Sequence, residues 1–261
     1  MLWILLFGFG ACVGSFLNVL IHRLPRENSI VRPGSKCPAC EVPIRYYDNI
    51  PILSYIFLRG RCRNCGARIS IRYPIVEAMA GALLVLGYLK FGLSPKMGIN
   101  LLLALSLLAV AFIDLEHQLI PNEISLPGIV LGFGLSFFLE GKEWWEAPLS
   151  SLIGGISGAT ALWVIRFLHM KISGIEGMGL GDVKLIAMIG AFLGWQALPS
   201  LLFISAFSGL LIGGGIILLT RKAARTPIPF GTFLAAGTIT YIFLEAEIIG
   251  ILLGLRSWII Y

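Results

Sequence analysis

Long apolar segments recur along almost the whole chain, and they restrict it to a helical fold inside a lipid bilayer. An α-helix needs about 17–25 predominantly apolar residues to cross a bilayer, and in lipid only helices and closed barrels satisfy their own backbone groups. Charged residues make up only 13% of the chain, and its mean hydropathy is +0.88. Soluble domains carry about 25% charged residues. The composition therefore excludes a soluble globular enzyme and predicts an all-α polytopic membrane protein.

We expect about eight transmembrane helices. The apolar windows lie at 1–22, 73–91, 97–114, 122–140, 149–170, 183–195, 198–220 and 229–250. The first lacks the basic start and the cleavage site of a secretory signal, so it is predicted to be retained as a span. The sixth is short and is expected to pack tightly, and Gly154 and Gly158 are expected to be helix-packing contacts. The chain thus divides into a first transmembrane helix at 1–22, a loop at 23–72 and a seven-helix membrane domain at 73–261.

Positive charge is concentrated in a few of the connecting segments. Ten of the 20 Lys and Arg residues lie between Arg23 and Arg72, and three more lie within 221–228. Such an excess indicates cytoplasmic loops, and it outweighs the alternatives of a solvated face or a nucleic-acid partner. With both termini outside, the cytoplasmic segments are 23–72, 115–121, 171–182 and 221–228.

The loop 23–72 carries two CxxC pairs, which are Cys37 with Cys40 and Cys62 with Cys65. Each CxxC turn directs two sulfurs at one metal ion, and two such turns complete the tetrahedron of a structural zinc site. Disulfides or a redox motif are the alternative, but thiols stay reduced in the cytoplasm. Four thiolates leave no open coordination position, so zinc is predicted to organise the loop. Gly66, after the last cysteine, is expected to relieve the backbone there.

Two aspartates, Asp114 and Asp182, lie at the ends of apolar segments. A carboxylate at membrane depth costs roughly 2.5–3.5 kcal/mol, so it is seldom incidental. The predicted topology places both at the cytoplasmic side and at the same depth. One of two adjacent carboxyls can activate a water while the other, protonated, hydrogen-bonds a peptide carbonyl. This arrangement predicts an aspartyl catalytic pair.

The neighbours of Asp182 bear on its role. Gly179 and Gly181 let the backbone turn tightly just before the acid. Lys184 either extends toward the membrane surface or moderates the charge of the pair. Taken alone, the acids also fit helix caps, because a carboxylate is favourable at a helix N-terminus. They fit a proton-coupled transporter as well, since transporters also use intramembrane acids.

Together these motifs resemble the type IV prepilin peptidases. The segment GSFLNVLIHRLP at 14–25 is similar to the opening signature of that family, and ISIRYPIVE at 69–77 follows the cysteines. The acids lie in IDLEHQLIP at 113–121 and GMGLGDVK at 177–184, and PFGTFLA at 229–235 comes near the last span. The order matches over nearly the whole chain. Two positions depart from the common pattern: Asn122 replaces an aspartate and Thr232 replaces a proline.

The resemblance implies an aspartyl protease of the bacterial inner membrane that cuts prepilins and pseudopilins after a glycine, on the cytoplasmic face. Asp114 and Asp182 match the catalytic positions, and the four cysteines match the metal site. Members with the cysteine-bearing loop commonly also N-methylate the new N-terminus with S-adenosylmethionine. The sequence contains no glycine-rich nucleoside-binding fingerprint, so methyl transfer is expected on resemblance alone.

Arg72 and Glu77 are expected either to contact the cofactor or the substrate amine, or to pair with each other. Two rival functions remain. The first is a leader peptidase without methyl transfer, in which the cysteine loop is only structural. The second is a proton-coupled transporter or a non-enzymatic pilus or secretion assembly factor.

Overall fold

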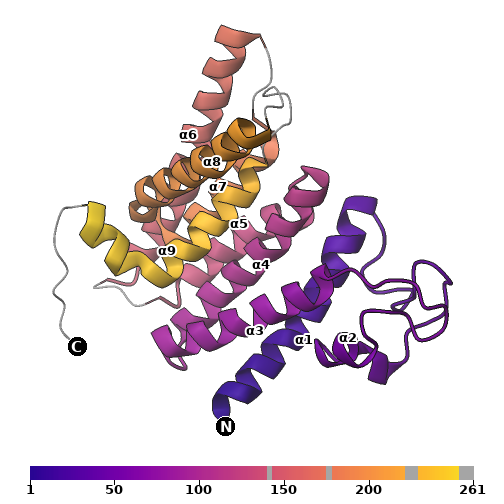
Figure 1. Ribbon diagram of the computed structural model, residues 1–261. Coiled ribbons are helices and arrows are strands. Elements are labelled where there is room, and N and C mark those ends of the chain that lie inside the picture. The colour runs from indigo at the N-terminus through magenta and orange to yellow at the C-terminus, as the bar shows by residue number, and fades with distance from the viewer. Residues whose placement is uncertain (140–142, 175–177, 221–228, 253–261) are drawn as a thin grey trace. The chain divides into compact units, whose positions relative to one another are not determined.

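The computed structural model describes residues 1–139, 143–174, 178–220 and 229–252 (Figure 1). The chain forms two compact units, Met1–Leu93 and Ser94–Tyr261. Within the described ranges the regular structure is helical. The only β-type pairings there are two isolated bridges in the cysteine loop, Lys36 with Pro43 and Arg61 with Arg68. The predicted all-α fold is confirmed.

The first unit is built on two antiparallel helices, α1 (Leu2–Arg23) and α3 (Arg72–Phe91). They pack closely because α1 presents glycines to its partner: a Cβ on Gly14 would lie 2.6 Å from Glu77 Cα. The connection between them carries the 3₁₀ turns η1 (Leu24–Arg26) and η2 (Tyr46–Asn49) and the short helix α2 (Leu53–Phe57). In Figure 1 this connection extends from one end of the α1–α3 pair.

The second unit is a helical bundle with α7 (Leu180–Leu193) at its centre. Residues 185–192 of α7 are all buried, because this helix packs against four others. These are α4 (Pro95–His117), α5 (Asn122–Ser136), α6 (Glu146–Ser173) and α9 (Phe230–Leu252). The turn η3 (Trp195–Ala197) leads from α7 to α8 (Leu198–Thr220), which packs on α9.

Close packing around α7 depends on glycine, as expected. A Cβ on Gly154 of α6 would lie 2.3 Å from the Gly190 carbonyl oxygen of α7, so neither position has room for a side chain. At 14 residues and about 1.5 Å per residue, α7 is shorter than the bilayer core of about 30 Å. The expectation of a short, tightly packed sixth helix is confirmed.

Within the described residues, eight helices of 14 or more residues correspond one for one to the eight apolar windows. Five segments are long and apolar enough to cross a membrane, judged by length and composition: Leu2–Arg26, Arg72–Phe91, Pro95–His117, Glu146–Ser173 and Trp195–Ile212. The count of eight spans stays a prediction. The basic segment 221–228, expected to be cytoplasmic, lies outside the described residues.

The compact units separate after Leu93, so α3 belongs with α1 and the cysteine loop. The division predicted after residue 72 is based on membrane topology, whereas the compact units are based on contacts within the chain. The predicted division stays a prediction.

Candidate functional site

Asp114 lies in the last turn of α4, with only 5% of its surface exposed. Its Oδ2 atom accepts the Thr232 backbone N–H at 2.7 Å and the Thr232 hydroxyl at 3.0 Å. The hydroxyl also lies 3.2 Å from the Ala111 carbonyl oxygen. Because proline has neither an N–H nor a hydroxyl, a proline at position 232 could supply neither donor. The first turn of α9 thus holds the Asp114 carboxyl directly.

The approach of α9 to this carboxyl requires Gly231. A Cβ on Gly231 would lie 3.0 Å from Asp114 Oδ2 and 2.8 Å from Ile120 Cδ1. Such separations are too short for any larger residue to fit without a shift of its neighbours. Glycine at 231 therefore lets the Thr232 amide reach Asp114.

Asp182 is the third residue of α7, and 8% of its surface is exposed. Its carboxylate accepts a hydrogen bond from the backbone N–H of Gly179, the N-cap residue. This is half of a capping box, in which an acid at the third helical position reaches back to the cap. Asp182 therefore caps α7. Whether it also has a catalytic role depends on its burial and on its neighbours.

The glycines beside Asp182 serve close packing. Gly179 has φ −72° and ψ 152°, an extended conformation open to most residues, so the expectation of a turn that needs glycine there is wrong. Gly181 lies inside α7, and a Cβ on it would be 2.9 Å from Ile120 Cβ. Ile120 follows α4 and packs against both Gly181 of α7 and Gly231 of α9. The ends of these three helices therefore lie close together.

The structure brings the two predicted acids to the same end of the second unit. Asp114 and Asp182 lie close enough for their charges to interact. The predicted neighbour Lys184 donates a hydrogen bond from Nζ to Asn122 Oδ1 at 2.8 Å. This contact ties α7 to the first residue of α5. The side chain at 122, which departs from the common family pattern, thus provides a neutral partner for Lys184.

The four predicted cysteine ligands form one cluster in the first unit. Their Sγ atoms all lie within 4.8 Å of one another, and Cys37 Sγ is 3.8 Å from Cys65 Sγ. A tetrahedron with Zn–S bonds of about 2.3 Å has sulfur–sulfur edges of about 3.8 Å. All four are free thiols, so the disulfide alternative is wrong. The donor set fits one tetrahedral metal ion.

The two CxxC turns repeat the same backbone pattern. Cys37 N–H donates to Val42 O at 3.0 Å, and Cys62 N–H donates to Ala67 O at 2.8 Å. The residue after each second cysteine is left-handed, with φ 57° at Glu41 and φ 70° at Gly66. The expected backbone role of Gly66 is therefore confirmed, and Glu41 adopts the same conformation without being glycine.

The electrostatics of the cluster favour a bound cation. Hydrogen bonds from the Val42 backbone and the Asn64 side chain lower the pKa of Cys40 to about 6. The Ala67 backbone favours the Cys65 thiolate, but burial and the neighbouring thiols outweigh it and raise the pKa of Cys65 to about 11. Four thiolates cannot coexist here at neutral pH unless a cation compensates their charge.

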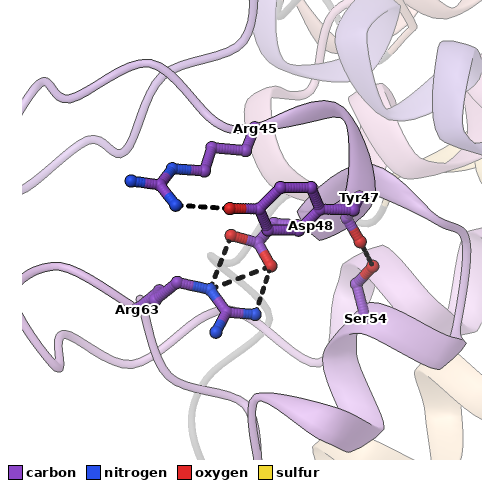
Figure 2. A network of polar contacts seen from close by, with 5 residues as sticks. All are labelled: Arg45, Tyr47, Asp48, Ser54 and Arg63. Atoms are coloured by element: carbon purple, nitrogen blue, oxygen red, sulfur yellow. Dashed lines mark hydrogen bonds and ion pairs between the residues drawn. The ribbon is translucent and has the colours of Figure 1, made fainter.

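A polar network braces the cysteine loop (Figure 2). Arg63, between Cys62 and Cys65, forms a forked ion pair with Asp48, with Nη2–Oδ1 at 2.7 Å and Nε–Oδ2 at 2.9 Å. These hydrogen bonds lower the pKa of Asp48. The Arg45 side chain bonds to the Tyr47 hydroxyl, and Ser54 Oγ donates to Tyr47 O at 3.1 Å. The network links the second CxxC turn to η2 and α2.

Glu77, a predicted cofactor or substrate contact, is buried in α3 with 7% of its surface exposed. Its Oε2 accepts the Ile52 N–H at 2.7 Å. Ile52 has φ 61° and ψ −52°, and Leu53 N–H bonds back to Pro51 O. This is a classic γ-turn, rare and strained, and such a conformation costs of order 1–3 kcal/mol. The other predicted contact, Arg72, stacks its guanidinium 5.3 Å from the Tyr73 ring centre.

Several residues of these sites were not predicted from sequence. They are Asn18, Asp48, Ile52, Ile120 and Gly231, together with the donor role of Thr232. Asn18 carries a usable signal, because an amide inside an apolar helix is costly unless it has a partner. Ile52 and Ile120 carry none, because an aliphatic residue gives no sign of its backbone conformation or of the glycines that it contacts.

The comparisons with known proteins agree with this arrangement. A family model described as the bacterial peptidase A24 N-terminal domain matches residues 8–91, and one described as the type IV leader peptidase family matches residues 101–214. The first match falls within the first compact unit and the second within the other.

Proteins called prepilin leader peptidase/N-methyltransferase are similar over most of the chain. The one from Stutzerimonas stutzeri is 41% identical over 256 residues, which cover 87% of this chain and 85% of the relative. The one from Aeromonas salmonicida (strain A449) is 42% identical over 260 residues, covering 88% and 87%. The one from Pseudomonas aeruginosa is 40% identical over 256 residues, covering 87% and 84%. No solved structure matches the chain. On these matches, the chain belongs to the type IV leader peptidase family.

Proposed function

We propose that this chain is an endopeptidase that removes the leaders of prepilins and pseudopilins and then N-methylates the new N-terminus. The observation that supports the peptidase activity is that two buried acids, Asp114 and Asp182, lie at one end of the second unit, close enough for their charges to interact. The names of the relatives support both the substrate and the methyl transfer.

Asp114 and Asp182 would act as a pair on one water molecule. Thr232 gives Asp114 Oδ2 an N–H and an O–H donor, which suit a carboxylate that carries the negative charge. Asp182 interacts with that charge, so it is the better carrier of the shared proton. Asp114 takes a proton from the water as it attacks the scissile carbonyl, and Asp182 donates a hydrogen bond to the carbonyl oxygen. Titration belongs to the pair and not to either residue alone.

The supporting residues position this pair. Gly181 and Gly231 leave room for Ile120 between the helix ends, and Gly179 provides the amide that orients Asp182. Lys184, through Asn122, fixes the first turn of α7 relative to α5. A glycine before the scissile bond suits such a crowded site, because its backbone extends between two carboxyls without a side chain.

The site is proposed to face the cytoplasm of a bacterial inner membrane. The support is the pattern of Lys and Arg along the chain, which predicts eight spans with 23–72 on the inner side. Prepilin leaders would then meet the enzyme before the pilin leaves the membrane. The division into a first helix, a zinc loop and a seven-helix domain belongs to this proposal.

The first unit would hold zinc and carry the methyl-transfer residues. Cys37, Cys40, Cys62 and Cys65 supply four thiolates in tetrahedral reach, so zinc would hold the loop in one conformation. S-adenosylmethionine supplies the methyl group when it is bound. Arg72 and Glu77 are the proposed contacts for the cofactor or the substrate amine.

Separate Asp114→Asn and Asp182→Asn variants test the catalytic pair in a prepilin cleavage assay. General acid–base groups contribute about 10²–10⁴-fold to a rate, so each variant should lose at least that much. Glu123→Gln, which removes an exposed acid from the first turn of α5, is the matched control and should cleave at the normal rate. Full cleavage by either aspartate variant would rule out the mechanism and favour a capping or transport role for the acids.

A further inference from the structure

Within the described part of the chain, one buried hydrogen-bond acceptor of the first unit lacks a partner. Asn18 lies in α1 with 2% of its surface exposed, and its Nδ2 donates to Tyr73 O at 3.1 Å. That bond fixes the orientation of the amide. Its Oδ1 atom is buried and has no hydrogen-bond partner among the residues that the structure describes. A buried acceptor without a donor is destabilising, so it calls for an explanation, and a ligand that supplies the donor is one.

In the same helix pair, the Glu77 carboxylate accepts hydrogen bonds from two neutral groups of the described residues. Its Oε2 accepts the Ile52 N–H at 2.7 Å, and the Ser15 hydroxyl also hydrogen-bonds to this carboxylate. A carboxylate offers about four lone-pair directions, so these two bonds leave it able to accept more. A second acceptor with spare capacity thus lies in the same helix interface.

The helix geometry turns both groups toward the interface between α1 and α3. Ser15 and Asn18 are three residues apart on α1, and Tyr73 and Glu77 are four apart on α3, so each pair shares a face. The Cα–Cβ bonds of a helix tilt toward its own N-terminus. Because α1 and α3 are antiparallel, the Asn18 and Glu77 side chains lean toward each other. Gly14 keeps the two backbones close at this level.

The cysteine loop reaches the same place through Ile52. The strained γ-turn at 51–53 directs the Ile52 amide at Glu77, and α2 begins at the next residue. The polar network of Figure 2 joins α2 to the second CxxC turn through Ser54, Tyr47 and Arg63. A metal-organised loop would therefore hold the Ile52 amide against Glu77.

We propose that Asn18 and Glu77 bind the ammonium group of an α-amino-acid moiety during methyl transfer. An ammonium group has three donors and no acceptor, so it satisfies both the unpartnered amide oxygen and the carboxylate. This inference rests on the methyltransferase half of the proposed function. Two reactants carry such a group: the new N-terminus of the cleaved pilin and the amino-acid end of S-adenosylmethionine.

If the ammonium belongs to the pilin, Glu77 also takes part in the proton balance. The ammonium must lose a proton before its nitrogen lone pair can attack, and Glu77 is placed to accept it. The nitrogen then forms a bond to the methyl carbon while the carbon–sulfur bond of the sulfonium breaks. The bonding electrons go to sulfur, which leaves as a thioether. If the ammonium belongs to S-adenosylmethionine, the two residues only hold and orient it.

The test compares methylation with cleavage in the full-length, zinc-loaded protein in detergent micelles. The variants are Asn18→Leu, which removes the amide, both its acceptor and its donor to Tyr73 O, at similar volume, and Glu77→Gln, which removes the charge. Asn100→Leu, a buried asparagine of α4, controls for the general effect of such a change. Mass spectrometry of the pilin product gives both activities. We expect methylation per cleaved molecule to fall at least about tenfold in both variants, the loss of one hydrogen bond to a charged group, and to stay normal in the control.

Binding measurements distinguish the two sources of the ammonium. S-adenosylmethionine carries it, whereas 5′-methylthioadenosine lacks the amino-acid part. Weaker binding of S-adenosylmethionine with unchanged binding of 5′-methylthioadenosine assigns the site to the cofactor. A raised KM for cleaved pilin with unchanged S-adenosylmethionine binding assigns it to the pilin. Equal losses for both nucleosides would mean general damage and overturn the inference.

Two further results separate this inference from the proposed function. Normal methylation by both variants, with an active wild type, overturns the inference alone. A wild type that cleaves but never methylates overturns the methyltransferase half of the proposed function, and the inference falls with it. If Glu77→Gln does not accumulate as folded protein, Asn18→Leu decides.

Discussion

The clearest single test of the acid pair is Thr232→Val, which removes one donor from Asp114 and changes little else. Valine has nearly the shape of threonine but no hydroxyl. The backbone N–H of residue 232 still donates to Asp114 Oδ2 at 2.7 Å, so the helix end stays attached. What disappears is the hydroxyl donor at 3.0 Å. The variant therefore probes whether that donor stabilises the charge on Asp114.

The size of the effect follows from the contact. A hydrogen bond to a charged group is worth about 1.5–3 kcal/mol, and about 1.4 kcal/mol corresponds to a tenfold change in rate. The Thr232 hydroxyl also lies 3.2 Å from Ala111 O, so its single hydrogen is shared between two acceptors. We therefore expect the lower half of the range, a cleavage rate about 10- to 40-fold below that of the wild type.

The assay is prepilin cleavage under single-turnover conditions, so that product release does not mask the chemical step. Thr232→Ser keeps the hydroxyl and should stay within about threefold of the wild type. Thr240→Val is the matched control, because Thr240 is an exposed threonine of α9 whose hydroxyl donates to its own helix, to Ala236 O at 2.9 Å. Equal rates for Thr232→Val and the wild type would refute the idea that this donor supports Asp114.

Two further outcomes follow from the packing and the charges. Gly231→Ala puts a methyl group 3.0 Å from Asp114 Oδ2 and 2.8 Å from Ile120 Cδ1. The rate of prepilin cleavage should fall by about tenfold or more, while methylation of precleaved pilin is unchanged. A normal cleavage rate would contradict the crowding at this position. Asp48→Asn breaks the forked ion pair to Arg63, so the purified protein, with about one zinc per chain, should lose zinc to a chelator faster than the wild type. Hydrogen bonds from Arg63 lower the pKa of Asp48 below its usual 3.8, so its contribution is complete above that value and is lost only as the pH falls through the lowered pKa. The ratio of the variant's zinc-loss rate to that of the wild type, which shares the cysteine titration, should therefore be the same at about pH 6 and about pH 7.5. A change in that ratio would count against the ion pair as its cause.

Much of the fold could be predicted because the rules that govern it are local. A run of apolar residues must form a helix in lipid, whatever its neighbours do, and each of the eight windows corresponds to a helix. The cysteine cluster was equally accessible, because two residues between cysteines already place both sulfurs on one side of a turn. Only the side chains that brace the loop, such as Asp48 with Arg63, needed the structure, since 15 residues separate the partners.

The support of the acid pair could not be predicted, because it depends on contacts between distant segments. Thr232 and Asp114 are 118 residues apart, and no spacing rule connects them. The glycines around Asp182 were identified correctly, but the reason expected for Gly179 was wrong. Gly181 is needed because Ile120 occupies the space of its side chain, and only the packing of three helix ends reveals that.

By itself, the sequence determined that the chain is helical and membrane-embedded, that four cysteines share one site, and which two acids are unusual. These properties follow from the lipid environment, from the spacing of the cysteines and from the cost of a charge in lipid. Each of these acts on one segment at a time. Only the tertiary structure decided that Asp114 takes its donors from α9, that Ile120 packs against Gly181 and Gly231, and that the Asn18 oxygen has no partner among the described residues. Those facts depend on which helix faces lie against each other, and close packing between segments far apart in the chain is what sets them.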